Sequence, residues 1–574
     1  MIKSTLVFLY ILCTVSLFAQ EEYASSANIL PGIMIQYQED DRSLKRFYHI
    51  IGSPERNKRL QIFYDTFLDD LHALRYDQLS VSDQVDYQLI QRKIENELHL
   101  LDIESKHYEE LKEYISIGIP IYSYEAKRRR GLKIEGKELA ATLFDITKKI
   151  ESKTNELEKS KEVWHQSILK SGKRIIKGQQ EALKSIWEFY NGYDPEFTWW
   201  IKAPRLRLDT AWTKYAQELE AHLDQSKMNK DDGSGIIGSP TGREELLRLL
   251  DRDMIPYSPE ELVEIALKEF AWCDQELLKA SREMGFGDNW EKAQEKVKQS
   301  YLAPSEQPEA MLRLYNESIS FLKDNDLITI PPLVEEVWRM EMLTPKQQLV
   351  SPFFLGGETL YISYPTDEMG HEAKMMSMRG NNPHFSRATV HHELIAGHHL
   401  QGFMNRRFQT HRRGQFRTPF WMEGWALYWE LLLYEKEFPK SPEDRIGMLF
   451  WRMHRCARII FSLNYHLEEW SPQQCIDFLV DRVGHEQDNA EAEVRRSFTT
   501  SYPPLYQLAY MTGGLQFRAL REELVGSGKM QLKEFHDRII RENAMPIEML
   551  RFIMKNEPVP KDFESNWRFY NVTE

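Results

Sequence analysis

Hydrophobic and polar residues follow a helical period along most of the chain. In stretches such as 82–101 and 137–169, apolar residues recur every three or four positions, which is the spacing of one buried helix face. The same pattern returns from residue 385 onward. Residues 355–365, LGGETLYISYP, form one of the few strand-like runs, because they are rich in tyrosine and isoleucine. The pattern therefore predicts a mainly α protein, a large helical fold with few short strands.

The clearest interruption of this pattern is the segment 228–243, MNKDDGSGIIGSPTGR. Glycine, serine, aspartate and proline crowd together there, as they do in loops and linkers. We place a domain boundary near residue 235, between an N-terminal helical region (20–235) and a C-terminal helical region (236–574). An ordered active-site loop is the alternative interpretation. Just beyond, SPEE at 258–261 predicts a helix start, with serine as the N-cap and proline in the first turn.

Residues 1–19 have the pattern of a secretory signal peptide. Lys3 provides a positive charge, residues 6–18 form an almost unbroken apolar run, and Ala19 is a small residue at the expected cleavage point. The run is too short to span a bilayer, and no later segment has eighteen consecutive apolar residues. Cys13 lacks the neighbouring small residues of a lipid-attachment site. We therefore expect an exported protein, periplasmic or extracellular, without a stable membrane anchor.

Composition limits the partners and the redox chemistry. The balance of 74 basic and 88 acidic residues gives a net charge of −14, whereas charge-driven binding to nucleic acid requires a basic footprint. No nucleic-acid partner is expected. Without the signal peptide the chain holds Cys273, Cys456 and Cys475. This odd and sparse set is not a disulfide framework, so we expect buried free thiols.

Four of the seventeen histidines fall within nine residues: His391, His392, His398 and His399. Glu393 follows the second of them, and a His-Glu pair followed by another histidine is the outline of a helical zinc site. Imidazole is a neutral nitrogen ligand that suits Zn²⁺. A neighbouring carboxylate can then take a proton from the water that the metal activates. An exposed polar helix with stacked histidines is the alternative interpretation.

The spacing departs from the ordinary zinc motif, in which the two histidines lie four residues and ~6 Å apart along a helix. In a straight helix, His398 would lie about 240° round from His392, and His399 would return to the same face about 10.5 Å away. Neither arrangement suits one metal ion. We predict a break near Ala396-Gly397, because glycine relaxes the backbone. His398 would then be the ligand, and a carboxylate or backbone carbonyl would hold His399.

A third ligand is offered by the segment 420–430, FWMEGWALYWE. A helix that carries Glu423 and packs on the histidine helix would complete a His-His-Glu set with one open position for water. Taken alone, the segment is typical of an aromatic core helix with a surface glutamate. Together with the histidine pair, it favours a catalytic type of zinc site.

Two segments, HELIAGHHLQ (392–401) and EGWALYWE (423–430), resemble the bacterial domain-of-unknown-function 885 family. The hallmark of that family is an HExxPGHHLQ-like segment followed by EGWALYxE. The resemblance continues through RIIFSLNYHLEEW (458–470), EVRR (493–496), PLYQLAYMTG (504–513) and FHDRIIRENAMP (535–546). The family is similar to gluzincin-type zinc metallopeptidases, so the resemblance implies a metallopeptidase-like helical fold. It also implies that the metal ligands are His392, His398 and Glu423. Glu393 would be the general base, and His399 is the alternate ligand.

Several positions depart from the family pattern. Ala396 stands where proline is usual, and Ser462 and Asn464 stand where aspartate and glycine are usual. Leu505 and Tyr506 replace the usual glycine and glutamine. The implied ligands and base are all present, so these departures bear on substrate preference more than on catalysis.

A hydrolytic zinc site also needs a donor for the oxyanion of the tetrahedral intermediate. Tyr510, Arg496 and His466 can each donate a hydrogen bond, and each lies in a segment that matches the family. We take these three side chains as candidate catalytic residues. Hydrogen bonding within a helical core is the alternative role for each of them.

Together, these observations predict an exported zinc-dependent peptidase whose site lies in the C-terminal region and whose substrates are short peptides. A metallohydrolase acting on a non-peptide amide or ester is one alternative on the same scaffold. A catalytically inactive binding protein is another.

The signal-like start generates a direct prediction. When the full chain is produced in a bacterial host, the mature protein should begin within a few residues of Gln20 and should be recovered outside the cytoplasm. N-terminal sequencing of the exported fraction checks this expectation. Intact protein beginning at Met1 and confined to the cytosol would contradict it.

Overall fold

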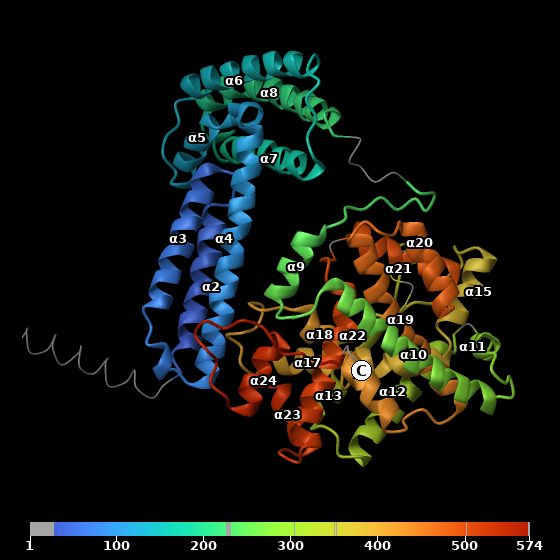
Figure 1. Cartoon of the computed structure of the whole chain (residues 1–574). Helices are drawn as coiled ribbons and strands as arrows, with labels where there is room; N and C mark the ends of the chain where they lie inside the picture. Colours follow the sequence, from blue (N-terminus) through green and yellow to red (C-terminus); the bar gives the residue numbers. More distant parts are fainter. Residues whose placement is uncertain are drawn as a thin grey trace, which may run out of the picture. The chain divides into compact units, whose positions relative to one another are not determined.

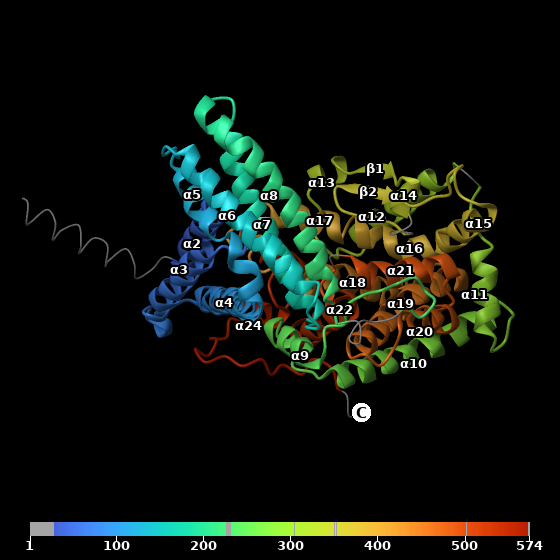
Figure 2. The same ribbon diagram turned by 90° about the horizontal axis from the view of Figure 1, so that it is seen from above.

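The computed structural model describes residues 28–224, 231–303, 305–348, 351, 353–500 and 502–571. Most of its helices are labelled in Figure 1, and the strands are labelled in Figure 2. The predicted signal peptide, together with Cys13 and Ala19, lies outside the described residues. Among the helices that are described, none combines the length and the apolar character needed to cross a membrane.

The chain divides into two compact units. The N-terminal unit contains residues 32–75 and the described part of 90–228, and the C-terminal unit contains residues 28–31, 76–89 and the described part from 229 onward. The principal division, at 228/229, falls in the glycine-rich segment that the sequence singled out near residue 235. The short stretch 76–89 also belongs to the C-terminal unit. A single boundary near residue 235 does not predict this.

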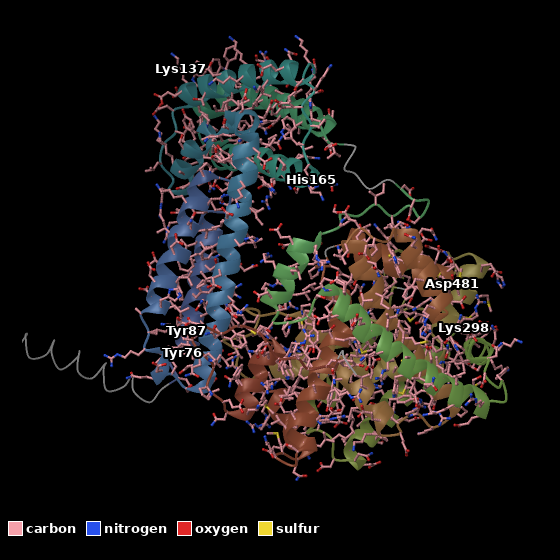
Figure 3. The ribbon with its side chains drawn as sticks, in the orientation of Figure 1. Tyr76, Tyr87, Lys137, His165, Lys298 and Asp481 are labelled. Carbon is pink, nitrogen blue, oxygen red and sulfur yellow. The ribbon has the colours of Figure 1, made fainter. Side chains whose placement is uncertain are left out.

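Buried polar contacts explain why residues 76–89 join the C-terminal unit. The carboxylate of Asp86 is fully buried and accepts a hydrogen bond from Arg412 Nε at 2.6 Å. The hydroxyl of Tyr76, which is labelled in Figure 3, donates to the carbonyl of Val559 at 2.9 Å. These partners lie 326 and 483 residues away along the chain, so no local pattern indicates them.

The N-terminal unit is helical. In α7, the residues Ile176, Gln179, Leu183 and Ile186 are buried, and their spacing of three and four places them on one face of the helix. Helix α8 packs on both α6 and α7, and α7 also packs on α5. The chain from its first described helix to the end of this unit forms α2 (Leu30–Phe47), α3 (Pro54–His72), α4 (Val81–Ile115), α5 (Pro120–Arg129), α6 (Gly136–Leu157), α7 (Gln166–Tyr190) and α8 (Pro195–Ala221).

The C-terminal unit contains a second and larger set of helices around an extensive apolar core. In chain order they are α9 (Arg243–Arg252), α10 (Pro259–Glu283), α11 (Trp290–Lys298), α12 (Gln307–Asp324), α13 (Pro332–Glu336), α14 (Pro345–Gln348), α15 (His371–Gly380), α16 (Pro383–Glu393), α17 (His398–Asn405), α18 (Pro419–Glu435), α19 (Pro442–His466), α20 (Pro472–Phe478), α21 (Gln487–Thr499), α22 (Tyr506–Arg521), α23 (Leu532–Ile539) and α24 (Ile547–Lys555). Short 3-10 or π-helical turns of this unit are η1 (Tyr76–Gln78), η4 (Leu479–Val483) and η5 (Glu522–Gly526), and the N-terminal unit contains η2 (Ser116–Gly118).

Two short parallel strands of this unit, β1 (Arg339–Met342) and β2 (Thr359–Ile362), lie side by side in Figure 2. The register pairs the first residues of the two strands with each other and the last residues with each other. Strand β2 falls within the segment 355–365 that the sequence predicted as a strand. The prediction of a mainly α fold with few short strands is confirmed.

Two local predictions are also confirmed. Helix α10 begins at Pro259 with Ser258 as its N-cap, and Glu261 completes a capping box by bonding back to the serine backbone. The three thiols of the described chain are buried and free, as expected for Cys273, Cys456 and Cys475.

Helices α18 and α22 approach closely because glycines meet where they cross. A Cβ atom added at Gly513 would lie 2.2 Å from the carbonyl oxygen of Phe420 and 2.8 Å from the Cα of Gly424. Only hydrogen atoms fit between the two backbones at this point. The close contact joins the middle of α22 to the start of α18, where Glu423 lies.

This contact predicts that Gly513→Ala destabilises the C-terminal unit, because the new methyl group must push two helix backbones apart. The free energy of unfolding should fall by about 1–3 kcal/mol. Gly402→Ala in α17 is the matched control, since its Cβ would meet only Arg406 Nη1 at 3.9 Å and alanine favours helix. Urea denaturation of the three proteins compares them, and equal stability of the Gly513 variant and wild type would contradict the tight crossing.

Candidate metal centre

The histidine segment is two helices joined by a break. Helix α16 ends at Glu393 and α17 begins at His398. Within the break, Gly397 N donates to the carbonyl of His391 at 3.0 Å. A Cβ at Gly397 would lie 1.8 Å from the carbonyl oxygen of His392, so only glycine fits. The break predicted near Ala396-Gly397 is present, although alanine replaces the proline that is usual at this place.

Helix α18 holds this break from the other side. The indole Nε1 of Trp425 donates to the carbonyl of Ala396 at 2.9 Å, and the side-chain amide of Gln401 donates to the carbonyl of Trp421 at 3.2 Å. Trp421 and Trp425 are both buried. The aromatic residues of FWMEGWALYWE are therefore core residues that also fix the backbone between the two histidine helices.

Three donor atoms converge beside the break. Glu423 Oε2 lies 3.1 Å from His398 Nε2 and 3.5 Å from His392 Nε2, and all three atoms lie within 4.8 Å of one another. Four ligands at about 2.0–2.1 Å from a tetrahedral zinc ion would be about 3.3 Å apart. Two of the three separations are close to this value, so the donor set fits a zinc ion in chemistry and in spacing.

Access to the three donors is uneven. The side chains of His392 and Glu423 are 2% and 5% exposed, whereas that of His398 is 18% exposed. Solvent therefore reaches the cluster on the side of His398. A ligand set that leaves one side open is typical of catalytic zinc sites, whereas structural sites are closed by four protein ligands.

A carboxylate behind His392 orients its ring. His392 Nδ1 donates to Glu430 Oε1 at 2.6 Å, and Arg455 Nη2 also binds this oxygen at 3.2 Å. Although burial opposes ionisation, Arg455 and His392 lower the pKa of Glu430 to about 2. A proton held on Nδ1 by Glu430 leaves Nε2, the nitrogen that faces Glu423, as the atom that a metal ion would bind.

Glu430 is a functional candidate that the sequence reasoning missed. It lies seven residues after Glu423 in α18, and two helical turns place the two side chains on nearly the same face. That spacing is the signal in EGWALYWE that indicates a paired role for the two glutamates.

The second oxygen of Glu423 has a partner of its own. The hydroxyl of Tyr506, at the start of α22, donates a short hydrogen bond to Glu423 Oε1. This leaves Oε2 facing the two histidines. Although burial opposes ionisation, His398 and His392 hold the pKa of Glu423 well below its usual range. Tyr506 was noted in the sequence only as a departure from the family pattern, and its contact with Glu423 is a second feature that sequence reasoning missed.

Glu393, the expected general base, is the last residue of α16 and is partly buried. Burial raises the pKa of its carboxyl group, against the opposing influence of His392 and His398. A Cβ at Gly356 would lie 2.2 Å from Glu393 Oε2, and Gly357 N donates to the backbone carbonyl of Glu393 at 3.1 Å. The loop before β2 thus forms one wall against this carboxyl group.

His399 is directed away from the three donors. Its Nε2 donates to the carbonyl of Val334 in α13 at 2.8 Å, and its side chain is buried. The neighbouring His391 packs edge-on against Phe438. Of the two candidates for the second histidine ligand, the structure brings His398 and not His399 to His392 and Glu423.

The three candidate oxyanion donors lie in different surroundings. The ring of Tyr510 stacks on that of His392, with centroids 6.1 Å apart. Arg496 Nε pairs with Glu493 Oε2 at 2.7 Å. His466 ends helix α19 and lies beside Thr241, 3.2 Å from its hydroxyl. Tyr510 is thus the candidate that contacts a presumed metal ligand.

His466 is set apart from the donor cluster along its own helix. It lies eleven residues beyond Arg455, the residue of α19 that binds Glu430, which corresponds to about 16 Å of helix. Burial lowers the pKa of His466 to about 4, so its imidazole is neutral at neutral pH. Its described contacts are with the segment around Thr241 and with Phe498.

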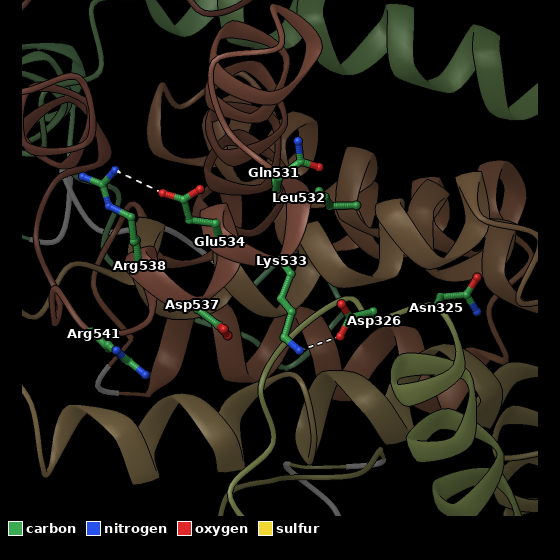
Figure 4. A pocket seen from close by; sticks show the side chains of 9 residues that line it. All are labelled: Asn325, Asp326, Gln531, Leu532, Lys533, Glu534, Asp537, Arg538 and Arg541. Atoms are coloured by element: carbon green, nitrogen blue, oxygen red, sulfur yellow. Dashed lines mark hydrogen bonds and ion pairs between the residues drawn. The ribbon is translucent and has the colours of Figure 1, made fainter.

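A separate surface pocket of about 750 Å³ lies between the end of α12 and α23, shown in Figure 4. Its charged side chains include the ion pairs Lys533–Asp326 and Arg538–Glu534. They neutralise one another and do not converge on one point, so this pocket carries no site assignment. The lining residues are Asn325, Asp326, Gln531, Leu532, Lys533, Glu534, Asp537, Arg538 and Arg541.

The family model described as "Bacterial protein of unknown function (DUF885)" matches residues 50–554. The chain belongs to this family. A search of curated proteins found no match for this DUF885 protein.

Two solved structures share its fold. "A putative lipoprotein of unknown function" from Shewanella oneidensis is 14% identical, with a TM-score of 0.62, and the match covers 92% of this chain and all of the other. "The putative lipoprotein from Colwellia psychrerythraea" is 16% identical, with a TM-score of 0.58, and the match covers 93% and 98% of the two chains. At these identities the likeness shows the fold alone.

The geometry generates a prediction about the two neighbouring histidines of the DUF885 protein. His398→Ala should lose stoichiometric zinc, because its Nε2 is one of the three converging donors, whereas His399→Ala should keep it. Elemental analysis of the two purified variants after zinc loading and dialysis compares them directly. Zinc loss in the His399 variant with full retention in the His398 variant would reverse the assignment, and full retention in both would remove this segment from the site.

Proposed function

We propose that this DUF885 protein is an exported zinc-dependent hydrolase that cleaves short peptides, with His392, His398 and Glu423 as the metal ligands. The observation that carries the proposal is the convergence of these three donors across a broken helix, with the carboxyl group of Glu393 beside them. Two histidines, one glutamate and an open fourth position form the ligand set of thermolysin-type zinc peptidases. This agreement supports the proposed similarity to gluzincin-type metallopeptidases.

A zinc ion at this site would supply Lewis acidity, which polarises a peptide carbonyl and lowers the pKa of a coordinated water. The chain's own residues then provide the proton transfers and the orientation. Glu393 takes a proton from the attacking water and passes it to the leaving amine, so it acts first as a general base and then as a general acid. Glu430 keeps the ring of His392 in one tautomer and one orientation.

The tyrosines of α22 support the same reaction. The hydroxyl of Tyr506 fixes one oxygen of Glu423, which keeps the carboxylate from rotating. We assign the oxyanion donor to Tyr510, because its ring stacks on His392. Burial raises the pKa of Tyr510 above its usual value, so its hydroxyl keeps the proton that an oxyanion donor needs. Arg496 and His466 are not used in this role.

Export of the chain is part of the proposal. The signal-like residues 1–19 support it, and so do the two solved structures of similar fold, which are described as putative lipoproteins. Short peptides are the proposed substrates, because the donors lie at the meeting of α16, α17, α18 and α22, where His392 and Glu423 are nearly inaccessible.

The decisive variant for the mechanism is Glu393→Gln. It removes the base without removing a ligand, so zinc content and melting temperature should stay at wild-type values while kcat falls by about 10²–10⁴-fold. Glu372→Gln, at an exposed glutamate in the first turn of α15, is the matched control and should keep full activity. Activity is measured by mass spectrometry of a mixed peptide library with the zinc-loaded proteins.

Two results would contradict the proposal in different ways. Wild-type turnover in the Glu393 variant would exclude this residue as the base. Cleavage of the library that is equally fast after zinc is removed with a chelator would exclude metal-dependent hydrolysis altogether.

A further inference from the structure

A group of buried charges lies behind Tyr510, outside the three donors and the base. It contains three arginines, Arg455 and Arg458 of α19 and Arg496 of α21, and two glutamates, Glu430 and Glu493. The arginines are 4%, 1% and 6% exposed, and the glutamates are 5% and 0% exposed. The arginine cluster, as we call these five residues, therefore has three positive and two negative charges in a nearly water-free environment.

The carboxylate of Glu493 contacts two guanidinium groups of this cluster. Arg458 Nε donates to Glu493 Oε1 at 2.8 Å, and Arg496 Nε lies 2.7 Å from Glu493 Oε2. Both arginines face this carboxylate through Nε. Arg458 Nη1 is buried and has no hydrogen-bond partner in the described part of the chain.

Two nearby histidines add no charge to the cluster. His454 and His485 lie 2.8 Å apart between ring nitrogens. Burial lowers the pKa of His485 to about 3 and holds that of His454 well below its usual value, with further lowering of both by Arg458 and Arg455. Both rings are therefore neutral. The five residues by themselves carry one positive charge in excess, apart from the carboxyl groups of Glu393 and Glu423 at the donors. A buried charge in excess is costly unless a counter-ion arrives.

Aromatic rings connect the arginine cluster to the donors. The guanidinium of Arg458 lies 4.3 Å from the ring centroid of Tyr510, and that ring stacks on His392. The arginines are thus one side chain away from a presumed metal ligand.

A second chain of contacts reaches the same place. Arg496 lies 5.7 Å from the ring centroid of Tyr502, whose ring stacks on that of Tyr506 at 4.3 Å. The hydroxyl of Tyr506 binds Glu423. Arg496 of α21 is therefore two aromatic rings from the donors, and Arg458 of α19 is one ring from them.

We propose that the arginine cluster binds the free C-terminal carboxylate of a short peptide, so that the enzyme cleaves close to the C-terminal end of its substrate. A guanidinium group matches a carboxylate with two parallel hydrogen bonds. One extended residue spans about 3.3–3.6 Å, so a carboxylate one or two residues beyond the scissile bond falls about 4–7 Å from it. This substrate class rests on the proposed peptidase function.

The test compares two peptides that are identical except at the C-terminus, one ending in a free carboxylate and the other in an amide. The zinc-loaded wild-type protein should cleave the acid with a kcat/KM about 10-fold or more above that of the amide, as expected for losing a charged hydrogen bond. A third peptide, amidated and carrying an internal glutamate, shows whether a side-chain carboxylate can replace the C-terminal carboxylate. Equal cleavage of acid and amide, or equal use of the internal glutamate, would overturn the inference.

A binding measurement removes turnover from the comparison. Isothermal titration of the zinc-loaded Glu393→Gln variant should show the acid peptide binding about 10-fold or more tightly than the amide. Equal binding would overturn the inference even if the library is cleaved. Absence of cleavage of every peptide by wild type would instead count against the proposed peptidase function, so the two failures are distinguishable.

Arg496→Lys tests the cluster itself. Lysine keeps the charge opposite Glu493 but loses the planar guanidinium, so the acid-to-amide ratio should narrow toward one. Arg452→Lys is the matched control, because Arg452 is a buried arginine of α19 that pairs with Glu269; this variant should keep the wild-type ratio. Arg458→Lys replaces the first variant if that one does not fold. An equal loss of activity toward both peptides would show a structural role and overturn the assignment.

Discussion

The candidate site depends on one constraint, the interruption of helix between residues 393 and 398. A continuous helix would place His392 and His398 on different faces, and no arrangement of neighbouring helices could bring both to one ion. The interruption is held by two hydrogen bonds, one from Gly397 to the carbonyl of His391 and one from Trp425 to the carbonyl of Ala396. The second comes from α18, the helix that also supplies Glu423. The same packing contact therefore sets the break and positions the third donor.

Close helix packing also fixes the positions of the side chains around the three donors. The glycine contact between α18 and α22 brings Tyr506 to Glu423, and α19 brings Arg455 to Glu430. Each presumed ligand on α16 or α18 thus has a partner that fixes its orientation, as metal ligands generally require. Arg452, another buried arginine of α19, pairs with Glu269. The arginine cluster instead contains three arginines and two glutamates, and it lies next to the donors.

Sequence patterns were sufficient to predict those features that depend on neighbouring residues along the chain. The helical period, the strand-like run before residue 365, the serine cap at Ser258 and the need for a break at Gly397 all follow from residues within one or two turns. Metal binding and catalysis by His392, Glu393, His398 and Glu423 stay predictions.

Features that depend on residues far apart in the sequence could not be predicted from such local patterns. The membership of residues 76–89 in the C-terminal unit rests on contacts such as Asp86–Arg412, which join residues 326 positions apart. Tyr506 and Glu423 are 83 residues apart, and their contact exists only because two glycines allow two helices to touch. Glu430 is an intermediate case, because its spacing from Glu423 was visible but its partner His392 was not.

Anomalous X-ray diffraction at the zinc edge, on crystals of the zinc-loaded protein, tests the central claim most directly. The account predicts one dominant peak about 2.0–2.1 Å from His392 Nε2, His398 Nε2 and a carboxylate oxygen of Glu423, with α16 and α17 still separated by the break. A dominant peak at any other group of side chains, or zinc-loaded crystals without a peak between these three residues, would contradict it.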